Sequence, residues 1–255
     1  MILKLIYVIS HMLLFNNHKT FIMKKSIVFF AISFMLVVCG FMPDIKPQTF
    51  TKSFISEPDN EGYIVNSKPK TFFPYYGGGQ GKEIPIGWDG QGFAMRGFIS
   101  FDFSGIKPKP GEVLVIDRAL LRVYEANTNM HPFNGDGTRT VQCYLVDYQN
   151  IDAEDFDVRP IDNCGTIAVN GYSVLTEHPL VVTSKVTALI AAHPATTKFQ
   201  FRLQFTDDEN LSSGSQLKQS MWNIFSGEES GKAAYRPALV LKYHYLKPAS
   251  PKRLK

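Results

Sequence analysis

The sequence predicts an all-β protein built as an antiparallel β-sandwich, with one short helix and a long Gly/Pro-rich insertion. Short segments in which apolar and polar residues alternate recur along the chain, and turn signals separate them. Only one segment has apolar residues at helical spacing. The 255 residues are 44% hydrophobic and 13% aromatic, which is enough apolar surface to bury one large core and excludes disorder as the main state.

The expected strands follow one another from residue 62 to residue 245. In the clearest of them, 198–205 (KFQFRLQF), every second residue is apolar, as in a strand that buries one face. The run 93–103 (FAMRGFISFDF) alternates in the same way toward its end. The complete set is 62–65, 93–103, 113–124, 138–148, 198–205, 222–225 and 238–245.

One helix is expected over residues 181–192. Val186, Leu189 and Ile190 are spaced to lie on one side of it, and Thr183 or Ser184 can cap its N-terminus. Residues 66–92 form the insertion. Its prolines and the three glycines at 77–79 predict an irregular segment with no helix and no central strand.

The first 42 residues have the pattern of an export leader. Lys24 and Lys25 precede an uncharged, mostly apolar run at 27–38, and Met23 is the expected true start. The run is shorter than the roughly 20 residues of a membrane span. Residues 43–53 are expected to be a linker, 54–246 the β-sandwich module and 247–255 a basic, mobile tail. The protein is therefore expected to be secreted or held at the cell surface.

Cys39 follows the apolar run and has two interpretations. It is either the lipidated first residue of a mature lipoprotein or part of a leader that is cleaved off, and a retained leader is a third outcome. A membrane is expected as a partner only through such a lipid or a retained leader.

The charge balance argues against a nucleic-acid partner. The leader contains four lysines and no acid, so the rest of the chain holds 23 basic and 23 acidic residues. A nucleic-acid binder would need a concentrated basic face.

The two cysteines beyond the leader, Cys143 and Cys164, are predicted to form a disulfide that closes a loop of about 20 residues. The alternative is a pair of reduced, buried thiols. No cysteine or histidine spacing indicates zinc.

The order of several segments resembles the DNRLRE-type secreted β-sandwich modules, which are related to carbohydrate-binding modules. Residues 96–104 (RGFISFDFS) and 117–124 (DRALLRVY) carry the resemblance, and 182–186 (VTSKV), 199–203 (FQFRL) and 236–240 (RPALV) extend it over roughly 56–245. The resemblance implies a jelly-roll topology. It also implies a binding or structural role on secreted or surface proteins, often beside polysaccharide-degrading enzymes.

An acidic group before the first expected strand is a candidate metal site. Glu57, Asp59 and Glu61 lie within five residues and could supply oxygen ligands to a structural calcium ion. The alternative is a solvated acidic loop. No other cofactor is expected.

The insertion carries candidate ligand-binding rings. Tyr75, Tyr76 and Trp88, with Phe72 and Phe73 nearby, could stack on the C–H faces of sugar rings. The alternative is that these rings pin the insertion onto the sandwich.

The expected function is that of a non-catalytic, exported module that binds a polysaccharide or cell-surface glycan. Nucleophile, zinc-protease, phosphate-loop and dinucleotide motifs are absent from the sequence. A structural or adhesion module without a sugar site is the first alternative. A polysaccharide-degrading enzyme is the second, because paired carboxylates can come together from distant parts of a chain.

Overall fold

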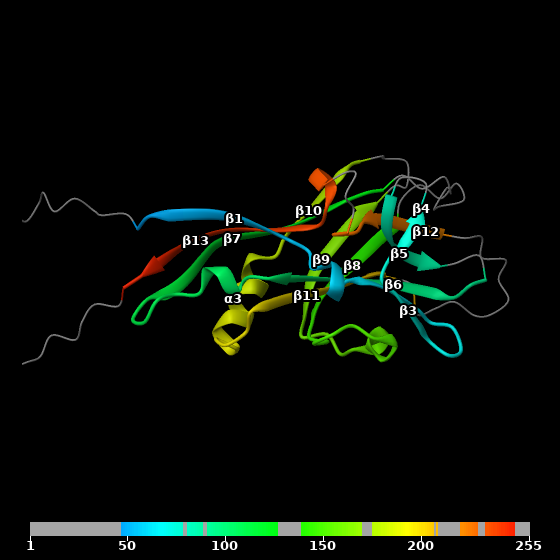
Figure 1. Ribbon diagram of the computed structural model, residues 1–255, viewed down its shortest axis with the longest axis horizontal. Coiled ribbons are helices and arrows are strands. Elements are labelled where there is room, and N and C mark those ends of the chain that lie inside the picture. The colour runs from blue at the N-terminus through cyan, green and yellow to red at the C-terminus, as the bar shows by residue number, and fades with distance from the viewer. Residues whose placement is uncertain are drawn as a thin grey trace, which may run out of the picture. The chain divides into compact units, whose positions relative to one another are not determined.

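The computed structural model describes residues 47–78, 81–88, 91–126, 139–169, 175–206, 208, 220–228 and 233–247. Two antiparallel sheets and one α-helix make up this part of the chain (Figure 1), so the predicted all-β sandwich is confirmed. The strand order does not establish the jelly-roll topology. The predicted leader and Cys39 lie outside the described residues, as does the predicted tail from residue 248 onward.

Sheet A has four strands, and its two edge strands come from distant parts of the chain. Its order is β1 (Thr49–Ile55), β13 (Ala238–Leu246), β7 (Val113–Tyr124) and β10 (Glu177–Val181). The last strand, β13, therefore pairs with the first, β1, so the two ends of the sandwich sequence lie in the same sheet.

Sheet B has nine strands and contains most of the predicted insertion. Its main path is β12 (Ser220–Phe225), β5 (Gly81–Trp88), β6 (Ala94–Asp102), β11 (Lys198–Phe205), β8 (Arg139–Val146) and β9 (Asp162–Val169). Off this path, β2 (Gly62–Val65) pairs with β6, β3 (Thr71–Phe73) with β2, and β4 (Tyr76–Gly78) with β5. A bridge between Glu125 and Ile224 joins the end of β7 to β12, so the two sheets meet at one edge.

The helical elements are short. They are α3 (Thr183–Ala192) and the 3₁₀ turns η1 (Pro58–Asn60), η2 (Ser104–Ile106), η3 (Ala153–Asp157) and η5 (Ala233–Tyr235). The predicted helix is confirmed, but its predicted cap is wrong. Val182 is the N-cap residue, and the Thr183 hydroxyl accepts a hydrogen bond from the Ala119 amide of β7 at 2.9 Å. No helix among the described residues has the length and apolar character needed to span a bilayer.

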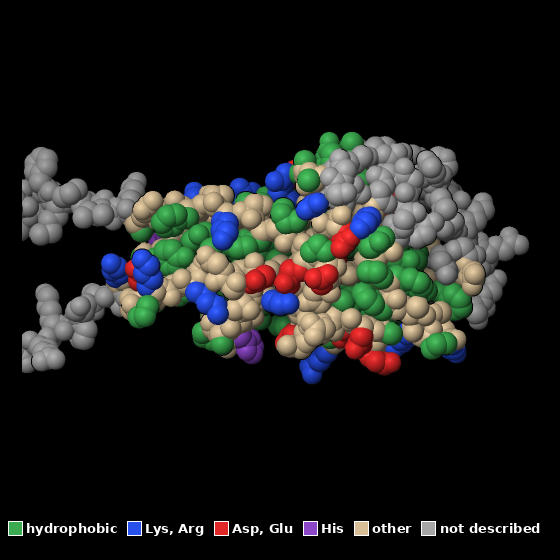
Figure 2. Space-filling model, viewed as in Figure 1, with side chains coloured by type: hydrophobic (Ala, Val, Ile, Leu, Met, Phe, Trp, Pro, Cys, Tyr) green, Lys and Arg blue, Asp and Glu red, His purple; other side chains and the backbone are tan. Residues whose placement is uncertain are grey.

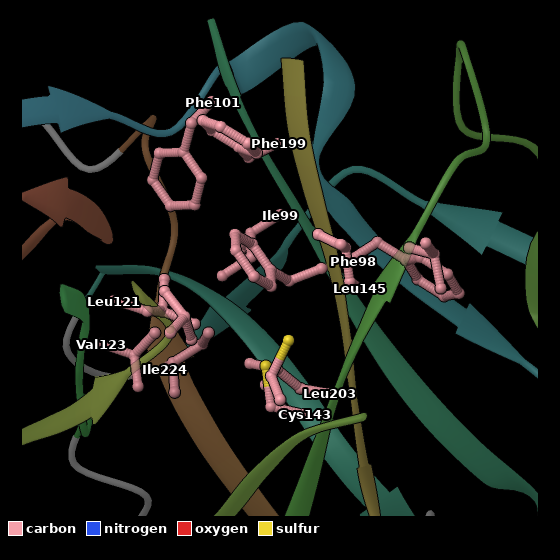
Figure 3. Packing of buried hydrophobic residues seen from close by; sticks show 14 of the residues in the cluster. Phe98, Ile99, Phe101, Leu121, Val123, Cys143, Leu145, Phe199, Leu203 and Ile224 are labelled. Carbon is pink, nitrogen blue, oxygen red and sulfur yellow. The ribbon is translucent and has the colours of Figure 1, made fainter. Parts of the chain in front are cut away.

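The core lies between the sheets. Figure 3 shows Leu121 and Val123 of β7 facing Ile99, Leu145 and Leu203 of sheet B, and all five are at most 1% exposed. The alternating apolar positions of β6, β8 and β11 supply most of this packing, as their patterns predict. Phe103 and Phe199 stack with ring centroids 4.1 Å apart.

The outer face of sheet B is polar but buried. Arg96 donates to Asp208 at 2.7 Å and to the Phe156 carbonyl at 2.6 Å, and its guanidinium lies 4.0 Å from the centre of the Phe156 ring. Arg202, one strand away on β11, donates to the Val158 carbonyl at 2.7 Å. These bonds hold the segment around η3 over the outer face of sheet B, because buried guanidinium groups require acceptors.

Two boundary predictions are wrong. Residues 49–53, predicted as linker, belong to β1, whose seven residues all pair with β13. The insertion, predicted as irregular, contributes β3, β4 and β5. Pro85 is tolerated inside β5 because at residues 84–86 this strand pairs only with β12, so the proline nitrogen can face the side without a partner strand.

Candidate functional site

A groove opens where the β2–β3 hairpin faces β5 and β12. Its volume is about 330 Å³, at the lower end of the roughly 300–1,000 Å³ of small-molecule sites. We call it the ligand groove. Its lining residues are Tyr63, Val65, Ser67, Thr71, Phe73, Pro85, Gln91, Phe93, Met95 and Met221. Figure 2 shows hydrophobic side chains gathered over the end of the sandwich where β3 and β6 are labelled in Figure 1.

Aromatic rings form one wall of the ligand groove. Tyr63 and Phe73 are cross-strand partners on β2 and β3, and their rings stack with centroids 5.1 Å apart at 17°. Tyr63 is 7% exposed whereas Phe73 is 39% exposed. The Phe73 ring is therefore held by Tyr63 and is still open to solvent. The thioethers of Met95 and Met221 are buried below it.

Polar groups of the groove come from the β2–β3 turn and from the segment before β6. The Ser67 hydroxyl donates to the Pro69 carbonyl at 2.7 Å and lies 3.4 Å from the Thr71 hydroxyl. Gln91 is exposed and lines the opposite side. A ligand in the groove would thus meet an aromatic ring, hydroxyl oxygens and an amide.

Backbone packing and one ion pair position the β2–β3 hairpin. Gly62 has φ +148°, and a Cβ atom there would clash with the carbonyl oxygen of Phe73. Only glycine therefore allows β3 to approach this closely. At the other end, the Lys70 ammonium lies 2.6 Å from the Asp157 carboxylate of η3.

The three rings predicted to bind ligand do not come together at the groove. Trp88 is 1% exposed and packs in the core with its ring centroid 5.1 Å from that of Phe205, so its assignment as a ligand-binding residue is wrong. It lies on the same face of β5 as Ile84 and Ile86, which are buried in the core. Tyr75 is 36% exposed, but the Lys82 ammonium lies 4.6 Å from its ring centroid and it does not line the groove. The side chain of Tyr76 lies outside the described residues.

The predicted calcium ligands point to different partners. Glu57 accepts from the Ser100 hydroxyl at 2.7 Å and lies 3.3 Å from the Lys198 ammonium, while Asp59 is exposed. Glu61 is buried, and its carboxylate contacts Ser226 after β12. In the part of the chain that the structure describes, no three acidic, histidine or cysteine side chains are grouped to hold a metal ion. The predicted calcium site is therefore wrong, because Glu57, Asp59 and Glu61 are not grouped to hold a metal ion.

Glu61 instead anchors the segment after β12. Its carboxylate accepts from the Ser226 hydroxyl at 2.7 Å and from the Gly227 amide at 2.5 Å. Burial raises the pKa of Glu61, and these hydrogen bonds oppose the rise. Gly227 is close-packed here, since a Cβ atom would lie 2.5 Å from the Ser56 hydroxyl.

The predicted disulfide is not present. Cys143 and Cys164 are free, buried thiols that hydrogen bond to each other. A register shift in the β8–β9 pairing brings them together, because Cys143 pairs with Gly165 and the next residue, Tyr144, pairs with Asn163. Burial raises the pKa of Cys143 well above its usual value. The pKa of Cys164 is lowered, chiefly by the hydrogen bond that Cys164 makes with Cys143.

The residues that line the groove were not singled out by the sequence, Phe73 excepted. Tyr63 and Met95 lie on strands whose patterns indicate burial, Met221 lies on β12 just before the predicted strand 222–225, Gln91 lies in a turn and Phe93 directly precedes β6. Only the aromatic residues of the insertion, Phe72, Phe73, Tyr75, Tyr76 and Trp88, pointed to this region.

Comparison with known proteins adds no relative. No family model matches the chain, and no curated protein matches it either. The resemblance to DNRLRE-type modules therefore stays a prediction.

Proposed function

We propose that this protein is a non-catalytic, exported module that binds a glycan in the ligand groove. The observation that carries the proposal is the exposed Phe73 ring, stacked on Tyr63 and flanked by hydroxyl and amide groups. A sugar presents a C–H face that packs on such a ring, and its hydroxyls find polar partners at the edge. The leader pattern at residues 23–42 supports export.

Binding without cleavage fits the composition of the groove. Among the residues that the structure describes, its lining includes hydroxyl groups but no carboxylate, histidine or cysteine, the residue types that most often act as acid, base or nucleophile. A binding site needs only shape, an aromatic surface and a few hydrogen-bonding groups.

The test is to apply the purified full-length protein to a panel of neutral and acidic polysaccharides, and to assay the supernatant for new reducing ends. Phe73→Ala is expected to weaken binding about tenfold, since an aromatic stack contributes about 0.5–1.5 kcal/mol beyond its buried area. Gln91→Ala is a second groove variant at an exposed position. Tyr75→Ala is the matched control, because Tyr75 is similarly exposed but lies outside the groove.

Loss of binding in Phe73→Ala and Gln91→Ala, with Tyr75→Ala unchanged and no new reducing ends, would support the proposal. Failure of the folded protein to bind any polysaccharide would reject it in favour of a structural or adhesion role. Release of new reducing ends would reject the non-catalytic part.

A further inference from the structure

The described residues on the outer face of sheet A include an exposed strip that crosses its centre. Cross-strand register places Ser53, Val240, Leu120 and Val181 in one row across all four strands. Val181 is 59% exposed, and the neighbouring Ile55 is 44% exposed. With strands spaced ~4.8 Å apart, this row is about 14 Å long. The surface is thus partly apolar and long enough to contact an extended chain.

Two cations lie directly opposite each other beside this row. Arg118 of β7 and Lys242 of β13 are cross-strand partners, with Thr51 of β1 next to Lys242. Both cations are exposed, and neither forms an ion pair with any residue that the structure describes. Like charges in directly opposed positions destabilise a sheet. This fold therefore gains nothing from the arrangement, which suits a ligand that brings negative charge.

The acids on the same face already have partners. Asp117, at the irregularity in the β7–β13 pairing, lies 3.0 Å from His244. Glu177 accepts from Arg122 through both carboxylate oxygens, at 2.7 and 2.6 Å. Among the described residues of these four strands, Arg118 and Lys242 are thus the cations on this face that can pair with an anionic ligand.

We infer that the outer face of sheet A binds an acidic polysaccharide, as a second surface separate from the ligand groove. Carboxylate or sulfate groups would contact Arg118 and Lys242, sugar faces would lie on the apolar row, and the Thr51 and Ser53 hydroxyls would meet sugar hydroxyls. Two cations are too few for a nucleic acid, whose interfaces are far more basic. Tyr124, the aromatic residue of these strands on this face, is 8% exposed and cannot stack on a base.

The test measures binding of the full-length protein to polygalacturonate and to dextran sulfate. Fully methyl-esterified polygalacturonate and unmodified dextran are the neutral counterparts. The Arg118→Gln/Lys242→Gln variant is expected to bind the acidic polymers about 5- to 30-fold more weakly at ~50 mM NaCl, with the difference largely gone at ~500 mM because salt screens exposed charges. Lys107→Gln/Lys109→Gln removes the same charge from an exposed turn and is the matched control, expected to bind as the unmodified protein does.

Three results would overturn the inference. The first is that the protein binds neither acidic polymer. The second is that the control variant loses as much binding as the Arg118/Lys242 variant. The third is binding of poly(dT) or phosphatidylglycerol vesicles, but of neither polymer, through the same two cations. The Phe73→Ala variant separates this surface from the groove. If Phe73→Ala leaves binding to every polysaccharide intact while the Arg118/Lys242 variant loses the acidic ones, the groove proposal fails and this one stands.

Discussion

Asp208 is the buried counter-charge for the outer face of sheet B, and Asp208→Asn tests how much stability it provides. Its carboxylate accepts from Arg96 Nε at 2.7 Å and from Gln204 Nε2 at 3.0 Å. The Asp208 and Arg96 side chains are 1% and 7% exposed. Burial, and secondly the charge of Arg96, lower the pKa of Arg202 to about 10, so the Arg202 guanidinium is still charged at neutral pH.

The expected loss follows from what is left after the substitution. Among the residues that the structure describes, Asp157 also lies near Arg96, at 3.4 Å, and it is 63% exposed, so solvent screens its charge. Breaking a buried ion pair by removing one partner costs ~3–5 kcal/mol. Asparagine keeps the shape and one acceptor oxygen, so we expect Asp208→Asn to lower the free energy of unfolding by about 3 kcal/mol.

Urea unfolding followed by tryptophan fluorescence measures this loss, because Trp88 and Trp222 are both 1% exposed in the folded protein. Asp162→Asn is the control, since Asp162 forms a half-exposed pair with Lys185 and should lose less than about 1 kcal/mol. Equal losses in the two variants would refute the reasoning. The Arg96→Met/Asp208→Asn double variant should recover part of the loss, because no isolated charge is then left behind at Arg96.

Three further predictions use the same protein. Gly62→Ala should lower the free energy of unfolding, measured in urea, by ~1–3 kcal/mol, because Gly62 has a positive φ and a Cβ atom would clash with β3. Gly111→Ala should lower it less, because Gly111 has φ +79° but open space around it. Equal losses in the two variants would contradict the clash. Because burial raises the pKa of Glu61 above 4.5, the folded state binds the Glu61 proton more tightly than the unfolded state does. The stability of the fold should therefore fall as pH rises from about 4.5 through the raised pKa. The melting temperature of Glu61→Gln should not show this fall with pH. Cys143 is 0% exposed and its pKa is raised, so iodoacetamide should react with it only after the protein unfolds, and mass spectrometry detects the label. Rapid labelling of the folded protein would count against a buried thiol.

The alternation of apolar and polar residues predicted the strands that have one buried apolar face and one polar face. It did not predict strands such as β1, which lack this pattern. The β11 pattern KFQFRLQF has apolar residues on the core side and polar ones on the other, and both its existence and its bounds were predicted. The β1 sequence TFTKSFI is mostly polar because six of its seven residues are at least partly exposed. Its strand conformation comes from pairing with β13, almost 200 residues later, and no local pattern encodes that partner.

The candidate site was less predictable than the fold, because neighbouring residues in the insertion have opposite environments. Trp88 and Tyr75 both lie in the same Gly/Pro-rich segment, yet β5 buries the first in the core and the second is partly exposed. Composition indicates that rings are present and says nothing about which sheet face they occupy. The groove also needs Met221 of β12, which the long-range pairing of β12 with β5 places opposite Gly87, two residues from Pro85.

The insertion is itself a part of the sandwich core, and this determines how its function can be tested. Ile84 and Ile86 are 0% exposed, and both lie close to the backbone of Gly97, where a Cβ atom would be 3.0 Å from each. Deleting residues 66–92 would remove these side chains together with Trp88 and expose the facing core, so a lost activity would report unfolding rather than a lost site. Substitutions at exposed positions such as Phe73 and Gln91 leave that packing in place. They are therefore the changes that can separate ligand binding from the stability of the fold.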